Sequence, residues 1–257
     1  MKSFPASLII LSLISSAAFA QYTTLDQVRQ RSALLLALDP NDPPFSSIDG
    51  NPPGIDIEIA RKIAEHLGVE LKPFWAHTQH FSFGSKLMKK YCDGLMDVPP
   101  GSLDVKVRGI DYTQPYYGTG FILAVRRGEK GIHNFADLKG MTVGIEAGVV
   151  AEKLKGHVAK EYPSQEAILV AVDKGEVAVG YVGALQAGWL LKTHPKWNVD
   201  LLKDPAPQDH WNTAIAVRKE DKELKAALNK AIQEMLENHE VEPILAKYGA
   251  PFYPPFN

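Results

Sequence analysis

The chain has 257 residues, of which 45% are hydrophobic and 23% charged, and its formal net charge is −2. These values are typical of a globular protein with one large or two modest domains, and they do not indicate disorder or a coiled coil. The basic residues form no block of like charge, so the sequence gives no support for nucleic-acid binding.

The first 20 residues predict a signal peptide. Lys2 precedes an apolar run from Leu8 to Ile14, and Ala18 and Ala20 form a small-residue cleavage signal. The apolar run is too short to span a bilayer, and no later segment is apolar over a membrane-spanning length. We therefore expect an exported protein with no membrane span.

Strand-like and helix-like segments alternate along the rest of the chain. Ile55, Ile59, Ile63 and Leu67 recur at helical spacing, and Gly68 is placed to end that helix. Short apolar runs predict strands at 33–39, 69–76, 92–98, 119–127, 141–147, 176–182 and 211–219. Helices are predicted at 55–68, 81–91, 148–158, 164–175, 183–194 and 221–249, the last with a break near Pro243. The alternation predicts an α/β protein with mainly parallel sheets.

Several polar side chains are predicted at the carboxyl ends of strands, where open α/β sheets bind their ligands. Asp39 ends the first predicted strand and Asp97 the third, while Glu146 and Tyr181 end the fifth and sixth. Either aspartate could instead cap a turn, because Asp readily bonds local N–H groups. Asp39, Asp42, Asp97 and Glu146 would form a site for a hard cation only if they converged.

The segment after Asp97 has an unusual composition for the end of a core strand. Pro99 and Pro100 form a rigid corner, and Lys106 and Arg108 follow it. If Asp97 faces a cleft, we expect Pro99 to hold its rim. We then expect Arg108, helped by Lys106, to hold an anionic group, because guanidinium matches such groups well.

Aromatic residues supply further candidates for the walls of a cleft. Phe45, Trp75 and Trp211 are predicted to face it, although most aromatic side chains in proteins belong to the core. His77 and His80 are three residues apart but lack a third ligand at a fixed spacing, so we predict no metal site and no cofactor. Cys92 is the single cysteine, and we expect it to be a buried structural thiol.

Four stretches resemble, in the correct order, the bacterial extracellular solute-binding proteins of family 3. They are residues 34–74, 111–127, 137–148 and 213–232. The resemblance implies a two-lobed, venus-flytrap fold of type II, with two strands crossing between the lobes near Val125 and Ala216. It places residues 22–120 and 215–257 in lobe one and residues 124–210 in lobe two. It also implies a location in the periplasm, and a small polar ligand that is held between the lobes and delivered to the permease of an ABC importer.

The resemblance carries expectations for the ligand that this sequence does not meet. Family members usually grip an α-carboxylate with an arginine and a small hydroxyl residue, and an α-amino group with an aspartate. Here Lys106 or Val105 occupies the arginine position, Val149 the hydroxyl position and Gly183 the aspartate position. The loss of all three argues against a standard α-amino acid as the ligand.

Three stretches are most similar to the branch of the family that accompanies pyrroloquinoline-quinone (PQQ) alcohol dehydrogenases. They are DPNDPPFS (39–46), KKYCDGLMDVPPG (89–101) and GYVGALQAGWLL (180–191). This similarity implies an alternative role as an accessory protein of a methanol-type quinoprotein dehydrogenase. A few relatives act as dehydratases, but an enzyme needs a positioned acid or base, and no nucleophile motif is present. We therefore predict a binding protein rather than an enzyme.

Overall fold

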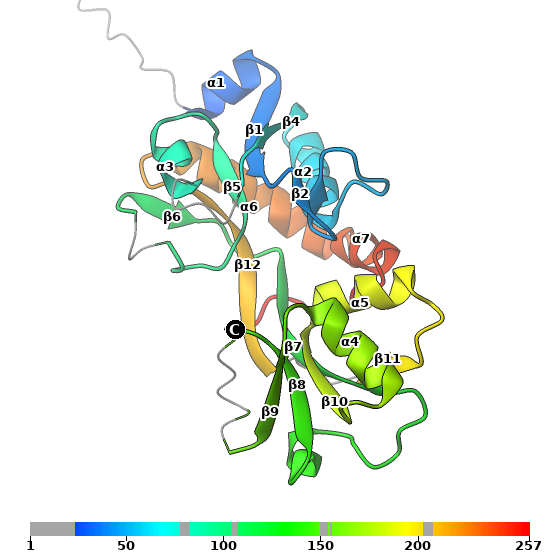
Figure 1. The fold of residues 1–257 in the computed structure, drawn as a ribbon. Coiled ribbons are helices and arrows are strands. Elements are labelled where there is room, and N and C mark those ends of the chain that lie inside the picture. Colours follow the sequence, from blue (N-terminus) through cyan, green and yellow to red (C-terminus); the bar gives the residue numbers. More distant parts are fainter. Residues whose placement is uncertain (1–23, 78–82, 104–106, 150–153, 155, 203–207) are drawn as a thin grey trace, which may run out of the picture.

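The computed structural model describes residues 24–77, 83–103, 107–149, 154, 156–202 and 208–257. The chain forms two lobes joined by two long strands (Figure 1). The predicted signal peptide and most of the predicted helix at 148–158 lie outside the described residues. No helix in the described ranges has the length and apolar character needed to cross a membrane.

The first lobe is a mixed sheet covered by helices. Strand β1 (Ala33–Leu38) pairs in parallel with β4 (Glu70–Trp75) and with β5 (Gly94–Val98). Strand β12 (Gln208–Arg218) runs antiparallel to β5 and to the short β6 (Ile110–Tyr112). The remaining elements of this lobe are α1 (Thr24–Gln30), the hairpin of β2 (Asn41–Asp42) and β3 (Ser46–Ser47), α2 (Ile55–His66), α3 (Phe83–Met88), α6 (Lys222–Glu237) and α7 (Val241–Lys247).

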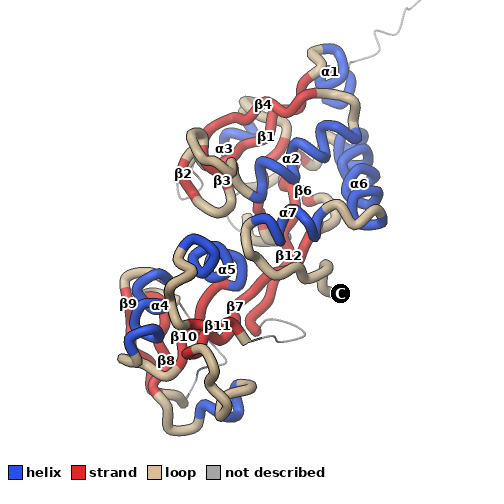
Figure 2. The backbone as a smooth tube through the Cα atoms, turned by 90° about the vertical axis from the view of Figure 1, so that its right-hand side faces the viewer, coloured by secondary structure: helices blue, strands red, loops and turns tan. Residues whose placement is uncertain are grey.

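The predicted helical spacing is confirmed by the burial of α2. Ile55, Ile59 and Ile63 are all 0% exposed and belong to the main core of the first lobe. α2 packs against α6, and both cover the sheet from the same side (Figure 2). Burying this apolar stripe stabilises the lobe by roughly 2 kcal/mol for each isoleucine.

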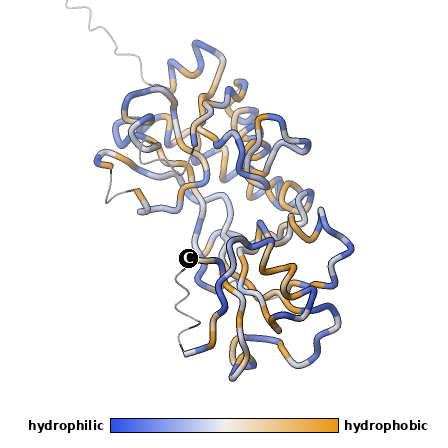
Figure 3. Tube along the Cα trace, in the orientation of Figure 1, coloured by the Kyte–Doolittle hydropathy of each residue, from blue (hydrophilic) through white to orange (hydrophobic). Residues whose placement is uncertain are grey.

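The second lobe has the sheet order β7-β10-β8-β9. Strand β10 (Val179–Gly183) is antiparallel to β7 (Tyr117–Arg126) and parallel to β8 (Thr142–Glu146), which pairs in parallel with β9 (Val158–Tyr162). The other elements are the 3₁₀ helix η1 (Phe135–Leu138), α4 (Gln165–Lys174), α5 (Ala184–Thr193) and β11 (Val199–Leu201), which pairs with β7. Figure 3 shows hydrophobic stretches inside both lobes, in agreement with the separate cores.

The two crossing strands are β7 and β12, which pair antiparallel to each other between the lobes. Within β12, Thr213 pairs with Tyr117 of β7, and Ala214 pairs with Val98 of β5. In β12 the partner strand therefore changes from β7 to β5 before Ala216 is reached. In β7 the change from β12 to the strands of the second lobe likewise comes before Val125, which pairs with β10 and β11. The residue limits given above for the two lobes remain predictions.

Some elements differ from the sequence-based predictions. β9 begins where the predicted helix at 148–158 should end, and it is an edge strand whose first four residues are exposed. The C-terminal helix breaks near Pro243, as predicted. α6 ends at Glu237, and Pro243 lies in the first turn of α7, where a backbone N–H has no partner to lose. Cys92 is 2% exposed, as predicted for a structural thiol.

Candidate ligand site between the lobes

A cleft of about 170 Å³ lies between the lobes and takes residues from both. Phe45 and Asp97 come from the first lobe, and Thr119 and Trp211 lie on the crossing strands. The second lobe contributes Phe121, Gln165, Gly183, Ala184, Leu185 and Gln186. We call these ten residues the ligand cleft. Because its walls belong to different lobes, opening and closing of the lobes changes its shape.

The second-lobe wall is held by a hydrogen bond and by ring packing. The Gly183 N–H, at the junction of β10 and α5, donates to Gln165 Oε1 at 2.9 Å. The Phe121 ring stacks on Tyr181 at 4.7 Å between centroids and meets the edge of Trp211 at 5.7 Å. Tyr181 is 1% exposed and its hydroxyl donates to Asp209 Oδ2 at 2.5 Å, so it supports the wall from behind.

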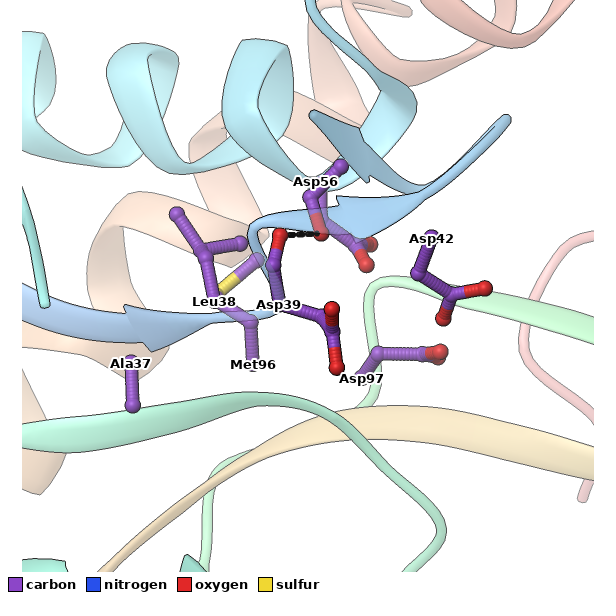
Figure 4. A pocket seen from close by; sticks show the side chains of 8 residues that line it. Ala37, Leu38, Asp39, Asp42, Asp56, Met96 and Asp97 are labelled. Carbon is purple, nitrogen blue, oxygen red and sulfur yellow. Dashed lines mark hydrogen bonds between the residues drawn. The ribbon is translucent and has the colours of Figure 1, made fainter. Parts of the chain in front are cut away.

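A second cavity of about 100 Å³ adjoins the cleft and is strongly acidic. Four aspartates from three segments surround it, namely Asp39 and Asp42, Asp56, and Asp97, together with Ala37, Leu38, Ser46 and Met96. Figure 4 shows the four carboxylates gathered in one small region. We call this cavity the acidic chamber. Asp97 lines both the acidic chamber and the ligand cleft, so the two spaces meet at its side chain.

Local backbone structure positions Asp39 and Asp97 at the ends of adjacent parallel strands. Asp97 has φ 54°, in the left-handed region that residues other than glycine seldom adopt, and its N–H donates to the Tyr116 hydroxyl at 3.1 Å. Asp39 Oδ1 accepts the Asn41 N–H at 3.0 Å, and the Asp39 carbonyl accepts the Ser46 hydroxyl at 2.7 Å. These bonds fix the β2–β3 hairpin over the chamber.

Asp56 reaches the chamber from the first turn of α2. The preceding Gly54 has φ 129°, and a Cβ atom there would lie 2.3 Å from the Phe45 carbonyl oxygen, so only glycine fits. The Asp56 N–H donates to the same carbonyl at 2.9 Å. Asp56 is 2% exposed, and its Oδ1 has no hydrogen-bond partner among the described residues.

Burial and mutual repulsion raise the pKa values of three of these carboxyl groups. Burial raises the pKa of Asp97 to about 6, and the charge of Asp42 adds to the shift. Burial, followed by the charges of Asp97 and Asp42, holds the pKa of Asp56 well above its usual range. The pKa of Asp42 is raised by burial and by Asp39. The carboxyl groups of the chamber therefore hold their protons to a higher pH than ordinary aspartates do.

The predicted site residues fall into three groups. Asp39 lines the acidic chamber, Phe45 and Trp211 line the ligand cleft, and Asp97 lines both. The others line neither space: Tyr181 is buried behind the wall, Trp75 packs against the first-lobe core, Pro99 and Glu146 are partly buried, and Arg108 is exposed. Lys106 lies outside the described residues.

Several residues of the site were not predicted from the sequence. Asp56 resembles an ordinary acidic residue in the first turn of a helix, and Gln165 resembles an ordinary polar one. Phe121 belongs to a strand that looks like pure core. Only the tertiary structure brings these side chains to the space between the lobes.

The described residues that line the cleft and the chamber include no cationic side chain, such as an arginine, that could pair with a ligand carboxylate. None of the described residues that line the cleft or the chamber is basic. Gly183 stands in the cleft where the resemblance would place an aspartate, and Val149 is a partly buried apolar residue. Among the described residues, no group of three or more His, Cys, Asp or Glu side chains is arranged to hold a metal ion.

Comparison with known proteins identifies the family. The model of the bacterial extracellular solute-binding proteins, family 3, matches residues 34–251. The chain belongs to this family. It is 29% identical over 245 residues to the L-cystine-binding protein TcyJ of Escherichia coli (strain K12), covering 91% of this chain and 89% of that protein. It is 26% identical over 231 residues to the arginine-binding extracellular protein ArtP of Bacillus subtilis (strain 168), covering 85% and 86% respectively.

The fold is shared with solved structures of the same architecture. The L-cystine solute receptor of Neisseria gonorrhoeae, in its unliganded open conformation, superposes with a TM-score of 0.77 at 19% identity. The match covers 88% of this chain and 97% of that one. The predicted two-lobed periplasmic-binding fold of type II is thus confirmed. All three of these proteins are named for binding a solute, and none for catalysis.

Proposed function

We propose that the protein is the periplasmic solute-binding component of an ABC importer and holds a small, amino-acid-sized polar solute in the ligand cleft. The observation that carries the proposal is the composition of the cleft, with walls from both lobes around two crossing strands. A solute bound there contacts both lobes and favours their closure. The relatives that bind cystine and arginine support a ligand of this size.

We propose further that the solute is not a standard α-amino acid. A carboxylate in this cleft would be desolvated beside Asp97 without a basic partner among the described lining residues. Membership of the family supports the proposed partnership with a permease, and the sequence of residues 1–20 supports the proposed export. The accessory role with a quinoprotein dehydrogenase rests only on the similarity of the three stretches given above.

Closure measured in solution tests the proposed function. The purified protein is screened against small polar metabolites by thermal shift, and each hit is examined by small-angle X-ray scattering. We expect at least one solute to lower the radius of gyration and, at a hundredfold its dissociation constant, to stabilise the fold by about 2.7 kcal/mol. Standard amino acids should give no such shift.

Two tryptophan variants form a matched pair for this test. Trp211→Ala removes a wall of the cleft and should weaken binding by roughly tenfold or more. Trp197→Ala removes a ring that stacks on His194 in the second lobe and lines neither cavity, so it should leave the affinity unchanged. Absence of closure with every solute in the screen would overturn the proposed function.

A further inference from the structure

We propose that the acidic chamber binds the ammonium group of an organic amine that lacks a carboxylate, with the body of the amine lying in the ligand cleft. This inference rests on the proposed function, because it names the chemical class of the transported solute. It is argued from the unpartnered Asp56, the charge of the chamber and its junction with aromatic walls.

The first observation is the state of Asp56. Its side chain lines the chamber, it is 2% exposed, and Oδ1 has no partner among the described residues. A buried carboxylate oxygen without a donor is costly, by about 1–3 kcal/mol or more. Folds rarely retain such an atom unless something else satisfies it. A ligand that donates hydrogen bonds would do so.

The second observation is the sign of the charge. Asp39, Asp42, Asp56 and Asp97 line one cavity of about 100 Å³, and no lysine or arginine is among the described residues that line it. An ammonium group offers three donors and a positive charge in a compact volume. It can therefore bond to two or three of these carboxylates at once. Charge-assisted hydrogen bonds of this kind are roughly twice as strong as neutral ones.

The third observation distinguishes an organic amine from a bare metal ion. The described carboxylates are not arranged as a metal-binding group. Instead, the chamber opens at Asp97 onto a cleft walled by Phe45, Phe121 and Trp211. An acidic cavity next to apolar walls fits a ligand that has an ammonium group at one end and an apolar or aromatic body at the other. The aromatic faces also attract a cation that passes between them.

The same junction disfavours a carboxylate on the ligand. Asp97 stands where the head and the body of the ligand would meet, so a carboxylate on the carbon next to the amine would lie against it. Repulsion there has no compensating partner among the described lining residues. An amine should therefore bind more tightly than the amino acid that has the same body.

Binding should also release protons. The groups that face Asp97 are Asp42 on the β2–β3 hairpin, Asp56 on α2, Tyr116 just before β7, Tyr117 on β7 and Thr213 on β12. His77 also faces the site, through its contact with Asp39 Oδ1 at 3.5 Å. Below pH about 6, Asp97 holds a proton that the ammonium must displace, so affinity should rise with pH.

The experiment compares three probes with the same aromatic body. They are 2-phenylethylamine, L-phenylalanine and 3-phenylpropionate, titrated calorimetrically into the purified protein at pH 5 and pH 7.5. We expect the amine to bind roughly tenfold or more tightly than the amino acid, and the acid not to bind. Affinity for the amine should be greater at pH 7.5, with proton release seen as a dependence on the ionisation enthalpy of the buffer.

Variants locate the binding to the chamber. Asp97→Asn and Asp42→Asn should each weaken amine binding by about tenfold or more, while Asp111→Asn, which alters a carboxylate paired with Lys225 elsewhere in the first lobe, should not. Asp56→Asn should also weaken amine binding. If this variant does not fold, the results for Asp97→Asn and Asp42→Asn decide the test. Equal or tighter binding of L-phenylalanine, or insensitivity of amine binding to Asp97→Asn and Asp42→Asn, overturns the inference.

Two further outcomes separate this inference from the proposed function. Calcium and lanthanum ions are titrated in the same way, and if they bind through the same carboxylates while no amine does, the chamber is a metal site and the inference is wrong. If 2-phenylethylamine and a set of aliphatic diamines all fail while another solute closes the lobes, the proposed function stands and the inference falls. If nothing closes the lobes, both fall.

Discussion

Asp97 is the residue at which the two cavities meet, and its titration reports directly on the acidic chamber. Its carboxyl group has a pKa of about 6 in the folded protein against a usual value of 3.8. A carboxyl group with a raised pKa binds protons more tightly in the folded chain than in the unfolded one. The free energy of unfolding therefore falls as the pH rises from about 4 to about 6, and the loss stays constant at higher pH.

Replacing Asp97 by Asn should relieve this penalty. At pH 4 the variant and the wild type should differ little, whereas at pH 7 Asp97→Asn should be more stable by up to about 3 kcal/mol, or 1.4 kcal/mol for each unit of pKa. Urea unfolding at pH 4, 5, 6 and 7 measures the difference. Asp111→Asn is the control with the opposite sign, because the hydrogen bond with Lys225 lowers the pKa of Asp111. A gain from Asp97→Asn that is the same at every pH would contradict the assignment.

Part of this site could be predicted from the sequence, for a physical reason. Asp39 and Asp97 follow apolar runs, and the carboxyl ends of neighbouring parallel strands meet at one edge of a sheet. Asp56 could not be predicted, because an acidic residue in the first turn of a helix is usually there to interact with the helix dipole. The place of Arg108 could not be predicted either, because a loop cation has many solvent-facing positions open to it; it is exposed and lines neither cavity.

At the scale of elements, α5 joins the two lobes although its neighbours in the chain belong to the second. Leu185 lies in the core of the first lobe, and the Trp189 ring packs 5.6 Å from that of Tyr248. Lys192 Nζ donates to the Lys247 carbonyl at 2.6 Å. Because Ala184, Leu185 and Gln186 of the same helix line the ligand cleft, this packing sets the position of one wall.

Gly188 allows that close approach, and its replacement should disturb it. A Cβ atom at this position would lie 2.3 Å from the Gly249 carbonyl oxygen, which is backbone and cannot move aside cheaply. Gly188→Ala should therefore lower the free energy of unfolding by about 1–3 kcal/mol. Gly131→Ala, at an exposed position, should change it by less than about 0.5 kcal/mol. Urea unfolding of the two variants provides the measurement, and equal effects would show that α5 is not closely packed.

Elements with strong periodicity were predictable and exposed edge elements were not. α2 was predictable because Ile55, Ile59 and Ile63 must all be buried together. β9 carries no such pattern, since four of its five residues are exposed and its stability comes from pairing with β8. The break between α6 and α7 lies a few residues before Pro243, because a proline in the first turn of a helix is compatible with the helix.

At the scale of the whole molecule, the C-terminal residues 252–257 lie along the two crossing strands. The Gly118 N–H of β7 donates to the Tyr253 carbonyl at 2.9 Å. Asn212 of β12 exchanges two hydrogen bonds with the backbone of Phe256, each of 2.8 Å. The tail is thus bonded to both strands at the place where the chain passes between the lobes (Figure 2). Bending of the lobes must strain or break these bonds.

Removing the tail should make the relative position of the lobes more variable. A chain that ends at Pro251 loses the bonds of Tyr253 and Phe256 to β7 and β12, whereas removal of Asn257 alone keeps them. Spin labels on Glu65→Cys in α2 and Lys174→Cys in α4 report the distance between the lobes, since both sites are exposed. Cys92 should not take up label, because burial raises the pKa of its thiol to about 12. We expect a broader distance distribution for the chain ending at Pro251 than for the control, because hinge strands without cross-links sample more conformations. Distributions of equal width would mean that β7 and β12 restrict the hinge by their own pairing.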